Sequence, residues 1–216
     1  MKKAIKLKMR VVKDLQDIDE NTVLITSTGE EFCRTHKVLA VSSLSGNFVK
    51  AEWLDQSARA KVCLPLGGFL WIEDEVVETK FQFSILQSIK DGNHDRQSGG
   101  ILIGYKVIVA GPSTPWKDNP IHNVKHLAEI AGAEVIDHQS IGDHDARSIL
   151  ILVANEEHAS NARGGKISKA MEGGAKKITW TKFWDTLQLQ KLDHLCGIST
   201  EAKHAPRLTV SSLRIC

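Results

Sequence analysis

The chain has 216 residues, of which 42% are hydrophobic and 25% are charged, and its net charge is +2. This apolar content argues against a disordered chain and allows one large core or two modest ones. The small net charge gives no overall electrostatic case for nucleic-acid binding. The longest apolar runs, such as residues 149–154, are far shorter than the ~20 residues of a membrane helix.

The first residues give an ambiguous pattern. From Ile5 to Val11, apolar and basic side chains alternate as they do in a strand, whereas alignment with the second half of the chain indicates the end of a helix. Both interpretations stay open. The basic side chains of this segment form one local cluster: Lys2, Lys3, Lys6, Lys8 and Arg10.

A predicted strand at 23–26 is followed by a segment that suits an anion. If Thr35 caps a helix, the backbone N–H groups of its first turn point the same way as the cations Arg34 and Lys37. A phosphate fits such a corner. The alternative is an ordinary solvated basic face on a helix whose apolar residues pack inward.

The middle of the chain contains a strand, a helix and a connection. Residues 48–54 hold a short strand and the start of a helix bearing Trp53, and the turn-rich residues 64–68 close this half. Trp71 is expected to join the following segment to the rest of the fold. Residues 90–100 are polar and glycine-bearing, so the boundary between the two halves is placed there.

The second half contains a fuller set of alternating strands and helices. The predicted elements are a strand at 105–109, a helix at 121–131, a turn into a strand at 132–136, a strand at 148–153, a helix at 165–171, and a last strand and Trp184-bearing helix at 177–184. Residues 112–120 and 137–147 are expected to form surface loops. Trp116 lies in the first loop, either folded against its own domain or offered to a partner.

The two halves resemble BRCT repeats. In the first half, the similarity begins with the pattern Arg34-Thr35-x-Lys37 and the helix after it, which match the second helix of such a repeat. The segment Phe48 to Leu54 matches its last strand and Trp-bearing helix. The second half contains the same pattern more fully. Residues 33–37, 64–69 and the run to Phe81 are similar to the checkpoint mediators, the family of the animal p-fifty-three-binding protein and its fungal relatives.

The resemblance implies an α/β fold of two BRCT repeats, each with a small four-stranded parallel sheet and helices on both faces. The expected division is a first repeat with its inter-repeat segment at 1–86, a linker at 87–100, a second repeat at 101–195 and a tail at 196–216. Too few residues precede Val11 for the first strand and first helix of a complete repeat. The expectation is therefore a first repeat shortened at its N-terminus, with residues 3–9 as a less favoured substitute strand.

The resemblance also implies a function. Such tandems bind a phosphoserine or phosphothreonine, and Lys37 and Arg34 match the family's phosphate-site lysine and its flanking arginine. Thr35 lies between them as the helix cap, and the family's hydroxyl donor has no counterpart here. The expected ligand is a phosphorylated histone tail, which implies a nuclear adaptor with other checkpoint proteins as partners. Trp53 and Trp184 are expected to be core residues.

Two other binding functions are consistent with the sequence. One is a phosphate-independent protein-interaction module with a vestigial pocket, which the shortened first repeat favours. The other is direct DNA binding through the N-terminal lysines, which the net charge disfavours. No membrane partner is expected.

The sequence offers little for catalysis. His122 and His126 have the i, i+4 spacing of a zinc pair, but no Glu follows His122 and a third ligand would need a loop histidine. Gly164-Gly165-Lys166 lacks the Ser or Thr of a P-loop. We therefore predict no enzyme, metal or cofactor. The cysteines are far apart without Cys-x-x-Cys spacing, which predicts reduced thiols: Cys33, Cys63, Cys196 and Cys216.

Overall fold

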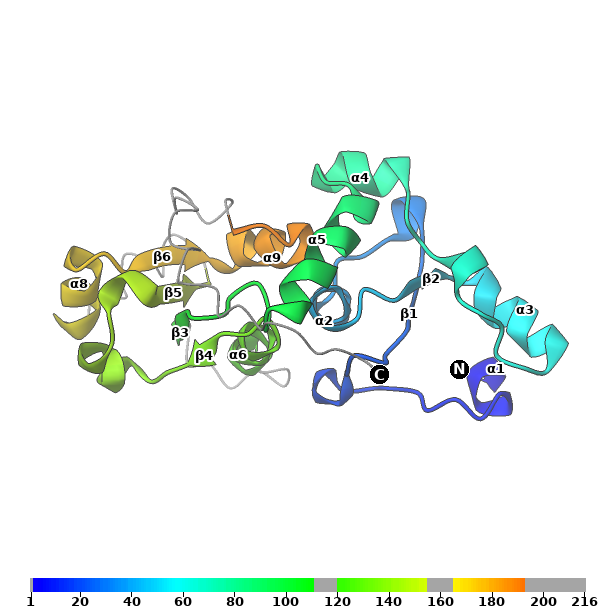
Figure 1. The fold of residues 1–216 in the computed structure, drawn as a ribbon, viewed down its shortest axis with the longest axis horizontal. Helices are drawn as coiled ribbons and strands as arrows, with labels where there is room; N and C mark the ends of the chain where they lie inside the picture. Colours follow the sequence, from blue (N-terminus) through cyan, green and yellow to red (C-terminus); the bar gives the residue numbers. More distant parts are fainter. Residues whose placement is uncertain (1, 111–119, 155–164, 193–216) are drawn as a thin grey trace, which may run out of the picture.

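The computed structural model describes residues 2–110, 120–154 and 165–192. The first repeat and the connection contain α1 (Lys2–Lys6), β1 (Leu24–Thr26), α2 (His36–Leu44), β2 (Phe48–Lys50), α3 (Glu52–Ala60), α4 (Glu75–Phe81) and α5 (Ile85–Gln97). The second repeat contains β3 (Lys106–Ala110), α6 (Pro120–Ile130), β4 (Glu134–Val135), β5 (Ile149–Val153), α8 (Gly165–Glu172), β6 (Lys176–Thr179) and α9 (Trp180–Leu189). Figure 1 shows the two repeats end to end.

The second repeat is the complete one. Its parallel sheet has the order β4-β3-β5-β6, and β5 is buried along its whole length. Alternate residues of β5 face different cores: Leu150 and Leu152 pack with α6 and α9, whereas Ile151 packs with α8. This two-residue alternation explains the unbroken apolar run at 149–153, because helices cover both faces of the sheet. The predicted four-stranded parallel sheet is confirmed.

The first repeat has a smaller sheet. β1 and β2 pair in parallel, and among the described residues no strand lies on the other edge of β1. The N-terminal residues Lys2–Lys6 are helical and pack against α3, so the helix interpretation is confirmed and the substitute-strand expectation is wrong. Most of the alternating residues, 7–11, follow the end of α1 and belong to neither a helix nor a strand.

The connection between the repeats is mostly helical. α5 occupies Ile85–Gln97, with Ser84 as its N-cap, and packs against α2. Arg96 donates a hydrogen bond of 2.7 Å to the backbone carbonyl of Ser42 in α2, which fixes the two helices to each other. Trp71 joins this segment to the first repeat, since its ring is buried and its centroid lies 5.1 Å from that of the Phe32 ring.

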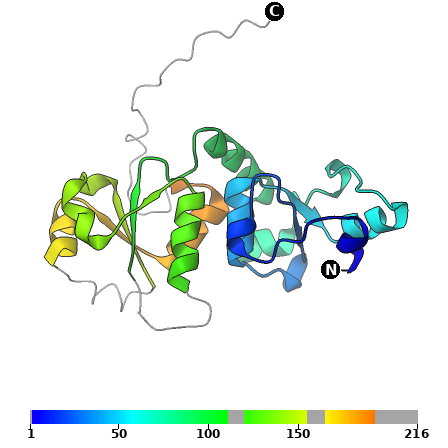
Figure 2. The same cartoon turned by 90° about the horizontal axis from the view of Figure 1, so that it is seen from below.

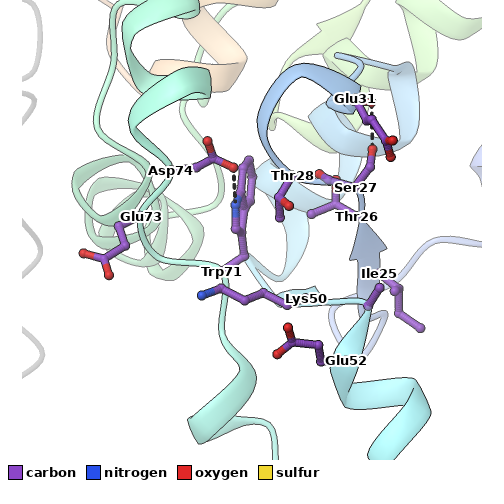
Figure 3. Close-up of a pocket in the computed structure, with 11 residues that line it drawn as sticks. Ile25, Thr26, Ser27, Thr28, Glu31, Lys50, Glu52, Trp71, Glu73 and Asp74 are labelled. Carbon is purple, nitrogen blue, oxygen red and sulfur yellow. Dashed lines mark hydrogen bonds between the residues drawn. The ribbon is translucent and has the colours of Figure 1, made fainter.

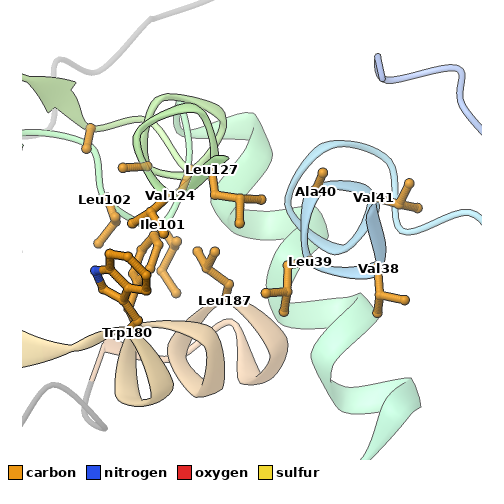
Figure 4. Close-up of a cluster of buried hydrophobic side chains, with 14 of the residues drawn as sticks. Val38, Leu39, Ala40, Val41, Ile101, Leu102, Val124, Leu127, Trp180 and Leu187 are labelled. Carbon is orange, nitrogen blue, oxygen red and sulfur yellow. The ribbon is translucent and has the colours of Figure 1, made fainter. Parts of the chain in front are cut away.

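α2 joins the two repeats. It packs against both α6 and α9 of the second repeat, as the two views in Figures 1 and 2 also show. Leu39 of α2 faces Leu127 of α6 and Leu187 of α9, and all three side chains are at most 1% exposed (Figure 4). These contacts belong to one apolar cluster that runs through both repeats. The repeats are therefore held by a shared core.

The two predicted core tryptophans differ in burial. Trp53 is 6% exposed and its indole N–H donates a 2.9 Å hydrogen bond to the Leu64 carbonyl. Trp184 is only partly buried at the edge of the shared core, where its ring meets His36 of α2. The fully buried aromatic residue of α9 is its neighbour Phe183. Helical rotation between adjacent positions turns Phe183 inward and Trp184 toward the first repeat.

Several expectations fall outside the described residues. They concern Trp116, the tail at 196–216, Cys196 and Cys216. Cys33 and Cys63 are free, exposed thiols. No helix of the described residues is long and apolar enough to cross a membrane.

The different burial of Phe183 and Trp184 predicts different costs of truncation. Phe183→Ala should lower the free energy of unfolding by about 3–5 kcal/mol, because it leaves a cavity in a closed core. Trp184→Ala should cost less, since part of its ring is already in water. Urea denaturation of the two variants measures both values, and a larger loss for Trp184→Ala would contradict this assignment.

Candidate functional site

The predicted phosphate site lies where α2 begins. Thr35 is the N-cap, and its side-chain oxygen accepts a hydrogen bond of 3.4 Å from the backbone N–H of Val38. The capping role inferred from sequence is therefore confirmed. The N–H groups of His36 and Lys37, in the first turn, have no carbonyl four residues back within the helix. Together with the helix dipole they favour an anion at this end.

Lys37 adds a positive charge to this helix start. Its side chain is partly exposed, and its ammonium group donates a hydrogen bond to the backbone carbonyl of Lys13. This carbonyl belongs to the segment just before the short 3-10 turn Leu15–Asp17, which packs against α2. An ammonium has three N–H donors, so this one bond leaves capacity for a phosphate oxygen.

Arg34 connects the helix start to the second repeat. Its Nη1 atom forms an ion pair with Asp185 of α9 and donates a 3.1 Å hydrogen bond to the side-chain carbonyl of Gln188. The guanidinium also lies 5.3 Å from the ring centroid of Phe81. The Arg34 side chain is 16% exposed. Its partners thus fix its position, and the remaining N–H donors of the fork can still meet a ligand.

His36 occupies the first helical position between these two cations. Its ring packs edge-on against that of Trp184, with centroids 5.7 Å apart. Burial lowers the pKa of His36, because water no longer solvates the charged ring. A neutral imidazole here leaves the positive charge of the site to Arg34 and Lys37.

A separate cavity of about 630 Å³ opens at the carboxyl ends of β1 and β2 (Figure 3). Neither Arg34 nor Lys37 lines it. Its lining comes from three segments and is mostly acidic and hydroxyl-bearing: Ile25, Thr26, Ser27, Thr28, Glu31, Lys50, Ala51, Glu52, Trp71, Glu73 and Asp74. Sequence reasoning missed this cavity, because its residues show no common spacing.

Asp74 is the structural anchor of the cavity wall. It accepts hydrogen bonds from the backbone N–H groups of Gly29, at 2.7 Å, and Val77, at 3.2 Å, and from the indole of Trp71. Burial alone would raise the pKa of Asp74, but these hydrogen bonds outweigh burial and lower it. The carboxylate therefore stays charged and ties the β1–α2 loop to the start of α4.

The histidine pair considered for zinc has other contacts. The His122 ring is hydrogen-bonded to the side-chain amide of Gln16, and Nδ1 of His126 lies 3.5 Å from the carboxylate of Glu129. Within residues 2–110, 120–154 and 165–192, no group of three or more potential ligands is arranged to hold a metal ion.

Comparisons with known proteins bear on the fold. No protein-family model matches the chain, and no curated protein matches it either. The chain is similar in structure to the BRCT5–BRCT6 domains of Brc1 from S. pombe, with a TM-score of 0.65 and 16% sequence identity over 93% of this chain and 92% of that chain. The molecule therefore has the fold of a tandem BRCT pair.

The lowered pKa of His36 predicts a pH dependence of stability. Below the ordinary histidine pKa of about 6.5, the unfolded chain binds a proton that the folded chain resists. The free energy of unfolding should therefore fall between about pH 7 and pH 5, and His36→Gln should remove part of that loss.

Urea midpoints at the two pH values measure the difference. His94→Gln removes an exposed histidine and controls for the substitution itself. An equal loss of stability in wild type and His36→Gln would show that His36 is not responsible.

Proposed function

We propose that this protein is a non-enzymatic adaptor that binds phosphorylated proteins in the DNA-damage response. The observation that supports this most is the start of α2, where Thr35 caps the helix, the Lys37 side chain is partly exposed and Arg34 is held by Asp185. The tandem BRCT fold and the sequence resemblance to the checkpoint mediators agree with this function.

The finer proposal concerns the ligand and its place in the cell. By the same resemblance, the ligand is a phosphorylated histone tail at DNA breaks, the protein acts in the nucleus on chromatin, and other checkpoint proteins are its partners. A site at one helix terminus suits a short phosphorylated tail, because the doubly charged phosphate supplies most of the attraction between the tail and the protein. Direct DNA binding is not part of this proposal.

The phosphate chemistry sets the expected energies. A hydrogen bond between charged partners contributes about 1.5–3 kcal/mol. Lys37 and the two first-turn N–H groups can each direct a hydrogen at one phosphate oxygen. Arg34 is held by Asp185 and Gln188, and in this proposal its remaining N–H donors bind the ligand beside the phosphate.

One observation favours a second candidate, a phosphate-independent interaction module. Lys37 already contacts the Lys13 carbonyl, and Arg34 is already paired with Asp185. In that account both cations stabilise the fold, and the partner binds elsewhere on the repeats.

The two candidates differ in what Lys37 does. If Lys37 holds the phosphate, a phosphorylated histone-tail peptide should bind more tightly than its unphosphorylated twin. Lys37→Met should then weaken binding of the phosphorylated peptide by about tenfold or more, since about 1.4 kcal/mol corresponds to a factor of ten. Fluorescence anisotropy with both peptides measures this ratio.

A matched control removes the same charge from another place. Lys6 is exposed on α1, so Lys6→Met should leave the ratio between the affinities for the two peptides unchanged. Equal binding of the two peptides, or a phosphopeptide preference that survives Lys37→Met, would reject the phosphate site and favour the phosphate-independent module.

A further inference from the structure

Arg34 contacts two acceptors of the second repeat through a single nitrogen atom. Its Nη1 atom forms the ion pair with Asp185 and also donates the 3.1 Å hydrogen bond to Oε1 of Gln188. Of the five N–H groups of an arginine, two belong to Nη1, so there is one for each acceptor. The other three, on Nε and Nη2, point in whatever direction the plane of the guanidinium gives them.

Two acceptors on one nitrogen fix the plane of the guanidinium. With one acceptor, the planar group can still turn about the direction of that hydrogen bond, and a second acceptor on the same atom stops the rotation. The ring of Phe81 lies on another side of the group, with its centroid 5.3 Å from Cζ of Arg34. The remaining N–H groups are therefore oriented before a ligand arrives, which lowers the entropy lost on binding.

The two acceptors differ in how firmly they are held. The Asp185 side chain is 40% exposed, whereas Gln188 is only 4% exposed. Water competes for an exposed carboxylate, and such a side chain can move together with its partner, so an exposed ion pair orients little. A buried amide keeps one position. Gln188 is therefore the acceptor that sets the orientation of Arg34.

The inter-repeat helix α5 holds Gln188 in place. Ser88 of α5 is 6% exposed, and its hydroxyl donates a hydrogen bond to the backbone carbonyl of Gln188. One turn further along α5, a Cβ atom at Gly92 would lie 3.1 Å from Cγ of Gln190, so the missing side chain lets the end of α9 approach. The end of α9 thus rests directly on α5.

We propose that Gln188 is a positioning residue of the phosphate site, which fixes the plane of the Arg34 guanidinium so that its remaining N–H groups meet the ligand beside the phosphate. This inference rests on the function proposed above and adds a residue to the same site. Gln188 acts through Arg34, from which it is separated by 154 residues, and not by touching the ligand. The first repeat supplies the donor, and the second repeat supplies its orientation.

Substitutions of Gln188 separate its acceptor oxygen from its packing. Gln188→Met keeps the length of the side chain and removes the acceptor. Gln188→Glu keeps an oxygen there and breaks no hydrogen bond of Nε2, since that atom has no partner in the part of the chain that the structure describes. Gln190→Met is the matched control, because Gln190 is equally buried at the same helix end and its amide donates to the Leu187 carbonyl.

The first readout is the affinity of the full chain for a phosphorylated histone-tail peptide, measured by fluorescence anisotropy. Gln188→Met should weaken binding by about fivefold, and Gln188→Glu should keep it within about twofold of wild type. Gln190→Met should not change it. In an Arg34→Met background, Gln188→Met should have no further effect, because a positioning residue acts only through the group that it positions.

The second readout is the guanidinium itself, and it needs no ligand. In NMR spectra of the isotope-labelled chain, an arginine that turns slowly about its Nε–Cζ bond gives separate signals for its Nη hydrogens, and one that turns freely gives averaged signals. The Arg34 signals should be separate in wild type, Gln188→Glu and Gln190→Met, and averaged in Gln188→Met. Arg34→Met identifies them by their loss.

Three results would overturn this inference. They are wild-type affinity in Gln188→Met, an equal loss of affinity with and without Arg34, and averaged Arg34 signals in wild type. The third needs no variant, so it applies even if Gln188→Met does not fold. Each can occur while wild type prefers the phosphorylated peptide, and the proposed function then stands. Equal binding of the phosphorylated and unphosphorylated peptides to wild type would reject that function, and this inference with it.

Discussion

The packing of α2 against α6 and α9 is the constraint on which the rest of the structure depends. Leu39, Leu127 and Leu187 meet in a closed apolar contact, so the two repeats share one core instead of meeting through a mobile linker. Burying such side chains contributes about 1.5–3 kcal/mol each, which fixes α2 firmly. Its N-terminus, with Thr35 as cap, is therefore held at the junction of the repeats.

Side chains of both charges lie along the segment that leads from β1 into α2. At the junction, Arg34 pairs with Asp185 while Lys37 stays partly exposed, so the helix start keeps a positive character. At the carboxyl ends of β1 and β2, carboxylates from several loops gather around the cavity instead. Glu31 of the cavity thus lies only three positions before Arg34 in the sequence.

The sequence predicted the second repeat well, because the continuous apolar run of β5 reflects a sheet covered on both faces. The Thr35 cap was also predictable, since it depends on neighbours within one turn. Local pattern could not choose between Phe183 and Trp184 as the buried ring, because helix rotation against a distant partner decides that. The partners of Arg34 lie far away along the chain, at separations of 151 and 154 residues, and no spacing rule finds them.

The central claim is that a phosphate binds at the start of α2, and backbone chemical shifts locate it most directly. Titrating the isotope-labelled chain with a phosphorylated histone-tail peptide should shift the amide signals of His36 and Lys37 most strongly, because their N–H groups would donate to phosphate oxygens. The unphosphorylated twin should leave those two signals in place. Shifts that are the same for both peptides, or that are absent from the first turn of α2, would contradict the account.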